Sequence, residues 1–178
     1  MQRARECLDE IVQLYQDGPS GRANELLERI ADLYFLTLEQ QSADERGSFG
    51  DAMLRMSQSA DPIARARFAE RIAKAAPVPV ELLLYLAREE ICVARPILQY
   101  SPCLREGDLV SIITDVGQDH LGATALRPNL TVPVTDLLVQ RGEPRVLVAL
   151  AQNVAADLSA SSVDRLYTLA NEEDELME

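Results

Sequence analysis

The chain has 178 residues, of which 47% are hydrophobic and only 4% aromatic, so it can build one aliphatic core or one short helical stack. Its formal net charge of −12 and pI of about 4.5 exclude nucleic acid as an expected partner, because that binding depends on Lys and Arg displacing counterions. The same charge favours a basic protein partner.

Hydropathy and cysteine usage indicate a cytoplasmic protein. No apolar run approaches the roughly 18 residues of a membrane span, and the N-terminal sequence MQRARECLDE has acids where a signal peptide needs an apolar core. Cys7, Cys92 and Cys103 are an odd number without CxxC spacing, which supports neither a disulfide framework nor a zinc site. We therefore expect no membrane contact, no metal and no cofactor.

Three helices are expected before residue 59. Apolar residues at helical spacing predict helices over 3–16, 22–41 and 44–58, and the sequence QDGPSG ends the first of them. These helices lack the repeating pattern of the later chain. We expect residues 1–58 to form an N-terminal helical cap, since the end of a repeat stack must hide its apolar face.

An acidic residue at the head of an apolar helix recurs at a nearly constant interval. Glu81, Asp108, Asp136 and Asp164 are separated by 27, 28 and 28 residues, and another helix lies between successive acids. The expected fold is therefore all-α, a right-handed stack of short helical hairpins in one continuous domain. Residues 59–178 form its four repeats, with paired helices over 61–75 and 79–88, 90–101 and 105–116, 119–127 and 132–140, and 143–154 and 161–172.

The recurring acid has a structural interpretation. If Pro79 is the first residue of its helix, Glu81 is the third, and Ser161 as N-cap likewise makes Asp164 the third. A carboxylate at this position faces free backbone N–H groups and the positive end of the helix dipole. We interpret the acids, Asp136 included, as helix-end groups rather than catalytic ones.

One proline, Pro96, falls inside an expected helix, where it either kinks the helix or delays its start to about Arg95.

The repeat pattern also predicts the core. The side chains that recur on the apolar face of the repeat helices are expected to be buried: Leu82, Leu83, Leu86, Leu109, Ile112, Ile113, Leu137, Leu138, Leu166 and Leu169.

Candidate interaction residues are few. Catalytic signatures are absent, because His120 is the only histidine and neither nucleotide-binding nor acyl-transfer motifs occur. Three arginines on one helix could hold an anion, although an ion-paired face is the more common arrangement. Ser101, Arg127 and Asn153 each close the first helix of a repeat, where polar groups bond open carbonyls. The residues considered for binding are Arg65, Arg67, Arg71, His120, Arg127, Arg141 and Asn153.

The N-terminal helices offer one more candidate surface. In ELLERIADLYFLTL, residues Leu26, Leu27, Ile30, Leu33 and Tyr34 form one apolar stripe, and two further apolar residues project away from it. These two, Phe35 and Leu36, are either covered by the helix over 44–58 or form a homodimer interface.

A set of apolar and polar positions recurs in the repeat region: Ala94-x-Pro96-x-Leu98, Ser101-x-x-Leu104, Asp108-Leu109-Val110, His120-Leu121, Arg127-x-x-Leu130, and Arg141-Gly142-Glu143 followed by Asn153. With these positions, the chain from about Ala52 to Ala170 resembles the DUF2336 family of bacterial proteins of unknown function. The resemblance implies an α-solenoid of HEAT-like or leucine-rich-variant-like repeats without catalytic residues. Gly122 and Thr124 stand where the family is usually more aliphatic, and Glu143 stands where Asp is usual.

Two functions are compatible with this sequence. The first is a non-enzymatic scaffold or regulatory adaptor that binds a protein, since stacked hairpins present a long surface. The second is a small-ligand-binding protein or enzyme that uses a groove of the solenoid. A concave pocket with convergent polar groups would favour the second.

Overall fold

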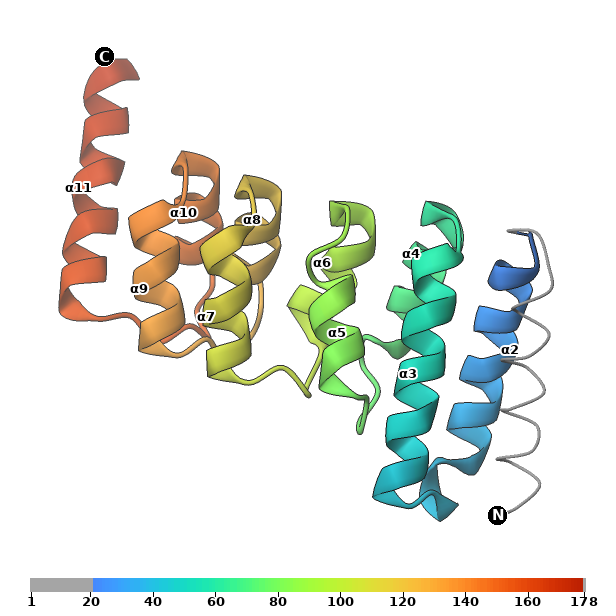
Figure 1. The fold of residues 1–178 in the computed structure, drawn as a ribbon. Helices are drawn as coiled ribbons and strands as arrows, with labels where there is room; N and C mark the ends of the chain where they lie inside the picture. Colours follow the sequence, from blue (N-terminus) through green and yellow to red (C-terminus); the bar gives the residue numbers. More distant parts are fainter. Residues whose placement is uncertain (1–20, 178) are drawn as a thin grey trace. The chain divides into compact units, whose positions relative to one another are not determined.

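All regular structure in the described part of the chain is helical. The structure is a computed structural model that describes residues 21–177, and these contain ten α-helices, one 3₁₀ turn and no strand. This confirms the expected all-α class for the described residues (Figure 1). The helix expected over 3–16 lies outside them.

The chain forms two compact units. Unit 1 comprises residues up to 97 together with 101–103, and unit 2 comprises 98–100 and 104–178. Unit 1 contains α2 (Gly21–Thr37), the 3₁₀ turn η1 (Leu38–Gln40), α3 (Ala43–Ser59), α4 (Pro62–Ile72), α5 (Val80–Leu86) and most of α6 (Ile91–Tyr100). Unit 2 contains α7 (Glu106–Asp115), α8 (Gln118–Ala125), α9 (Val132–Arg141), α10 (Pro144–Ala151) and α11 (Ala160–Met177). The proposed boundary at residue 58 rests on the repeat pattern and stays a prediction.

In unit 1, α2 packs against α3 and α4, and α3 packs against α5. The aromatic rings of Tyr34 and Phe49 meet edge to face at 5.6 Å between centroids, and the Tyr34 hydroxyl donates to the Pro77 carbonyl at 2.6 Å. α3 and α5 approach closely at Gly50, where a Cβ atom would lie 2.7 Å from the ring of Pro79. A side chain at residue 50 would therefore separate these two helices.

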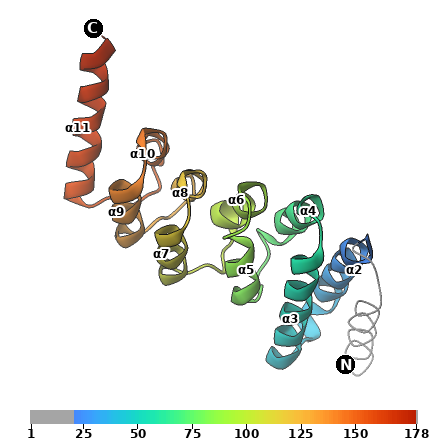
Figure 2. The same ribbon diagram turned by 45° about the horizontal axis from the view of Figure 1, so that its top comes forward.

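In unit 2, the helices alternate between two rows. α9 packs against α7 on one side and α11 on the other, while α8 packs against α10. Figures 1 and 2 show α7, α9 and α11 side by side in one row and α8 and α10 in the second. Contacts of α9 with both α8 and α10 join the rows.

The helix starts explain the recurring acids only in part. The Asp108 carboxylate accepts a hydrogen bond of 2.9 Å from the backbone N–H of Arg105, the N-cap of α7, as the helix-end interpretation expects. Glu81 is the second residue of α5 rather than the third, because the helix begins at Val80.

Two expectations at α9 and α11 are wrong. α9 begins at Val132, so Asp136 lies beyond its first turn. The N-cap of α11 is Ser159, whose hydroxyl accepts from the backbone N–H of Ser162 at 3.1 Å, so neither Ser161 as cap nor Asp164 as third residue is correct. Serines cluster here, and the earlier one takes the cap.

Seven of the ten expected core residues are buried, and three are not. Leu137, Leu166 and Leu169 are half-buried. In α9 the buried stripe runs through Val134 and Leu138, four residues apart, which places Leu137 at its border. The two leucines of α11 belong to a helix that packs against α9.

Pro96 lies inside α6, which starts at Ile91, so the delayed start at Arg95 is excluded.

Candidate functional site

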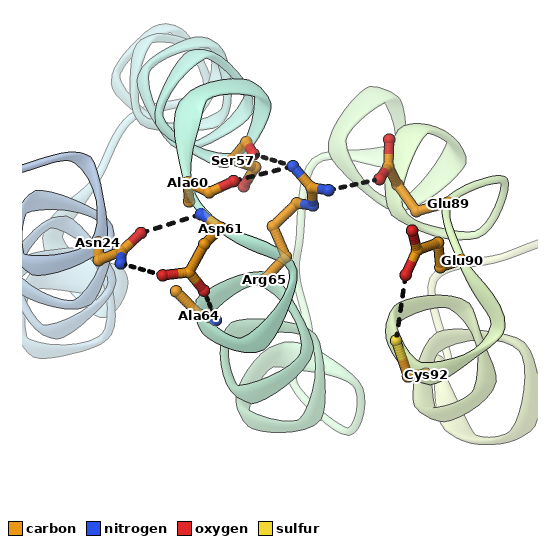
Figure 3. A network of polar contacts seen from close by, with 9 residues as sticks. All are labelled: Asn24, Ser57, Ala60, Asp61, Ala64, Arg65, Glu89, Glu90 and Cys92. Carbon is orange, nitrogen blue, oxygen red and sulfur yellow. Dashed lines mark hydrogen bonds and ion pairs between the residues drawn. The ribbon is translucent and has the colours of Figure 1, made fainter. Parts of the chain in front are cut away.

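A polar network surrounds the start of α4 in unit 1 (Figure 3). The Asp61 carboxylate caps α4 by accepting from the backbone N–H of Ala64 at 2.8 Å. The Asn24 amide donates to the second Asp61 oxygen at 2.5 Å, and its carbonyl accepts from the Asp61 N–H at 3.1 Å. The bond from Ala64, followed by the one from Asn24, holds the pKa of Asp61 below its ordinary value. Asp61 therefore joins α4 to α2.

Arg65 occupies the centre of the same network. Its guanidinium donates to the carbonyls of Ser57 at 3.3 Å and Ala60 at 2.9 Å, and it pairs with the Glu89 carboxylate at 3.2 Å (Figure 3). The exposed fractions of the Arg65 and Glu89 side chains are only 14% and 22%. The Glu89 carboxylate also bonds Tyr85. Burial is the main cause, and this hydrogen bond the second, that raises the pKa of the Tyr85 hydroxyl to about 12. Arg65 thus fastens the end of α3 to the turn after α5.

The other two arginines of α4 have different surroundings. Arg71 pairs with Glu28 at 3.4 Å and Asp32 at 2.5 Å, and its guanidinium lies 5.5 Å from the centre of the Phe35 ring. Arg67 is exposed. Arg65 and Arg71 therefore contact separate partners rather than converging on one anion site.

In unit 2, three polar side chains bond the ends of helices one repeat earlier. Arg127, just after α8, donates to the carbonyls of Leu98 at 3.0 Å and Leu104 at 3.4 Å. Asn153, just after α10, donates through its amide to the carbonyls of Ala125 at 2.8 Å and Arg127 at 2.7 Å. The predicted bonding of open carbonyls is confirmed for these two residues.

Arg141 makes the corresponding bonds in the other row. At the end of α9 its guanidinium donates to the carbonyls of Ile113 and Val116 at the end of α7, the latter at 3.3 Å. Burial of the Arg127 guanidinium, the corresponding group after α8, lowers its pKa. We term Arg127, Arg141 and Asn153 the carbonyl clamps, because each donates to two backbone carbonyls that lie 23 to 29 residues earlier in the chain.

Two further polar residues singled out from the sequence, His120 and Ser101, lie in different units. His120 lies half-buried in the first turn of α8, and its carbonyl accepts from the Thr124 hydroxyl at 2.9 Å. The side chain of Ser101 is buried. Among the described residues, no three His, Cys, Asp or Glu side chains gather where a metal ion could bind.

Asp136 holds the start of α11. Its carboxylate accepts from the hydroxyls of Ser159 and Ser162, each at 2.6 Å, and these bonds lower its pKa. A hollow of about 440 Å³ lies beside it, lined by Asp136, Val139, Gln140, Ser161, Ser162 and Arg165. Asp136, on α9, therefore bonds the start of α11, the next helix in its row.

The N-terminal candidates are only partly covered. Phe35 is half-buried and meets Tyr34 edge to face at 5.5 Å between ring centroids. Leu36 is 81% exposed, so the expectation that the helix over 44–58 covers it is wrong. That helix, α3, packs against α2, whose buried side chains include Leu27 and Ile30. The alternative, a homodimer, stays a prediction.

Sequence reasoning missed several residues that join the helices. Gln118 donates to the Arg141 carbonyl at 2.9 Å and accepts from the Glu143 N–H at 2.9 Å, closing the turn between α9 and α10. The Thr135 hydroxyl donates to the Asp157 carbonyl at 2.7 Å. A polar residue at the start or on the apolar face of a repeat helix is the signal that could have identified them.

Within the described residues, these features define an all-helical protein in which polar side chains of unit 2 donate to helix ends 28 residues earlier. Residues 93–178 match the model of the family described as "Uncharacterised protein conserved in bacteria (DUF2336)". This match confirms the resemblance for the C-terminal part of the chain, residues 93–178. Neither the comparison with curated proteins nor that with solved structures gives a match. In the described residues, no helix combines the length and the apolar character that crossing a membrane requires.

Proposed function

We propose that this chain is a non-enzymatic, cytoplasmic interaction module, a HEAT-like α-solenoid that binds a basic protein through unit 2. The observation that carries the proposal is where apolar side chains are exposed. Of the nine large hydrophobic residues exposed in the described part of the chain, seven belong to unit 2: Tyr100, Leu126, Val132, Val148, Val154, Val163 and Tyr167. Exposed apolar area concentrated in one region is typical of a binding surface.

Charge supports a basic partner. The sequence of unit 2 contains 13 acids and five arginines, a net charge of −8, whereas unit 1 contains 16 acids and 12 basic residues, a net charge of −4. Arg127 and Arg141 donate to backbone carbonyls, and Arg145 pairs with Asp119 at 3.1 Å. An acidic surface with exposed apolar groups attracts a basic, partly apolar partner.

The solenoid interpretation rests on the two alternating rows of unit 2 and on the carbonyl clamps, whose bonds reach back 28 residues from Arg141 and from Asn153. The exposed thiol of Cys92 is compatible with a reducing cytoplasm. A small-ligand role would have to use the hollow beside Asp136, whose carboxylate is already held by two serines. Protein binding is therefore the better supported function.

Capture from bacterial cytosol tests the proposal. The tagged full chain should retain one protein in a fixed ratio, and roughly 1 M salt should release it because the attraction between the charges is screened. Tagging the captured protein in turn should recover this chain. Failure to retain any protein in a fixed ratio, or a small molecule retained in native mass spectrometry instead, would contradict the proposal.

A further inference from the structure

We propose that the outer face of α10 and α11, formed by Val148, Val163 and Tyr167, is a docking site for a basic amphipathic helix of a partner protein. We term these three residues the end face. The inference rests on the proposed protein-binding function and assigns it to one surface. It follows from comparing each helix of unit 2 with the equivalent helix one repeat earlier.

The first observation concerns the row of α8 and α10. The helices begin 26 residues apart, at Gln118 and Pro144, so Val148 is the equivalent of Gly122. Gly122 faces α10, since a Cβ atom there would lie 4.0 Å from a methyl group of Val146. Val148 is 46% exposed. The position of α8 that faces the next helix is therefore occupied, in α10, by an exposed apolar side chain.

The second observation concerns the row of α9 and α11. Their starts are 28 residues apart, so Val163 and Tyr167 are the equivalents of Thr135 and Val139. Thr135 is buried and bonds the segment that leads into α11, and Val139 lines the hollow that α11 helps to form. Both therefore lie toward the next helix.

Their equivalents on α11 are exposed and larger in apolar area. Val163 is 49% exposed and Tyr167 is 70% exposed. They lie four residues apart, on one side of α11. On α8 and α9, these positions contact the next helix of the row. On α10 and α11, the last helices of the two rows within unit 2, the equivalent positions carry exposed apolar side chains. The shape that such positions fit is another helix.

Charge selects the occupant. A second copy of this chain would bring another unit of net charge −8 against the first, and the sequence after Tyr167 adds five acids between residues 172 and 178. Repulsion between like charges therefore opposes self-association at this face. A helix with aliphatic residues on one side and Lys or Arg on the other matches both the apolar end face and the negative net charge of unit 2.

A synthetic peptide tests the site directly. The probe is a fluorescein-labelled helix of about 18 residues, long enough to form in isolation, with leucines on one face and lysines on the other. Its acidic twin has glutamate at every lysine position. Binding of both to the full chain is followed by fluorescence anisotropy, and circular dichroism confirms that each protein variant is folded.

Two sets of neutral substitutions provide matched proteins. Val148→Ser, Val163→Ser and Tyr167→Ser together alter the end face, while Leu126→Ser, Val132→Ser and Val154→Ser together alter three other exposed residues of unit 2. The net charge is the same in all proteins. The end-face variant should bind the lysine peptide at least about tenfold more weakly than the unchanged chain, and the control variant should bind it normally.

Three results would overturn the assignment: equal affinities for the two variants, equal binding of the acidic twin, or no binding of the lysine peptide to the unchanged chain. The same variants in the cytosol capture experiment separate this inference from the proposed function. If the end-face variant still captures a protein in a fixed ratio, the function stands and the end-face assignment fails. If the unchanged chain captures nothing, the proposed function itself fails.

Discussion

Units 1 and 2 join their helices by different chemistry. In unit 1, charged pairs without a common interval connect helices, as in Arg65 with Glu89 and Arg71 with Asp32. In unit 2, the carbonyl clamps repeat along the rows and bond uncharged backbone oxygens. Arg127 and Arg141 of unit 2 are thus bonded to backbone oxygens, whereas Arg65 and Arg71 of unit 1 each pair with an acid. The following predictions test this comparison, from the largest expected effect to the smallest.

The largest effect is expected in the core of α9. Leu138 is fully buried and Leu137 is half-buried. Leu138→Ala should lower the free energy of unfolding by roughly 2 to 5 kcal/mol, because a cavity replaces the lost side chain. Leu137→Ala should cost about 1 kcal/mol, since part of that side chain already contacts solvent. Urea denaturation of both variants measures the difference, and equal losses would place the two leucines in the same environment.

The clamp at Arg127 should have the next largest effect. Arg127→Met keeps much of the apolar stem but leaves the carbonyls of Leu98 and Leu104 without their donor, at a cost of roughly 1.5 to 3 kcal/mol. Arg145→Met is the matched control, because its side chain is 61% exposed and bonds only carboxylates, and it should change stability by less than about 0.5 kcal/mol. A clamp variant as stable as this control would remove the clamps from the account.

A smaller, salt-dependent effect is expected in unit 1. Arg65→Met removes the bonds to the Ser57 and Ala60 carbonyls together with the Glu89 pair, and only the part due to the pair, about 1 kcal/mol at low ionic strength, should shrink in roughly 1 M salt. Arg67→Met, on the same helix and exposed, should have little effect at either salt concentration. Thermal unfolding at two salt concentrations provides the measurement. An Arg127→Met effect as salt-sensitive as that of Arg65→Met would contradict the difference between the units.

The smallest effect concerns Asp136 and depends on pH. Hydrogen bonds from Ser159 and Ser162 lower its pKa below 3.8, so ionised Asp136 stabilises the fold above that value, and this contribution disappears as the pH falls through the lowered pKa. Asp136→Asn should therefore lower the Tm slightly at pH 7 and not at all in strong acid. Asp51→Asn, at an exposed site on α3, is the matched control. A Tm difference that grows as the pH falls would reverse the assigned sign.

The sequence predicted most helices of the described region because their starts are marked locally. Pro62, Pro133 and Pro144 lie in the first turns of α4, α9 and α10, and a repeat interval locates the partners of Arg127 and Asn153. The pattern could not decide between neighbours with similar chemistry, as in Leu137 and Leu138 or Ser159 and Ser161. The side-chain partners of unit 1 follow no interval, so the pairing of Arg71 with α2 could not be inferred from spacing.

Hydrogen exchange of the full chain, alone and with saturating lysine peptide, tests the central claim that unit 2 binds a partner at its end face. The account predicts that peptide binding slows amide exchange mainly in α10 and in the first half of α11, residues 144–151 and 160–169. Exchange in α2 to α4 should stay unchanged. Slower exchange in α2 to α4, or in α7 and α8 with none in α10 and α11, would contradict the claim.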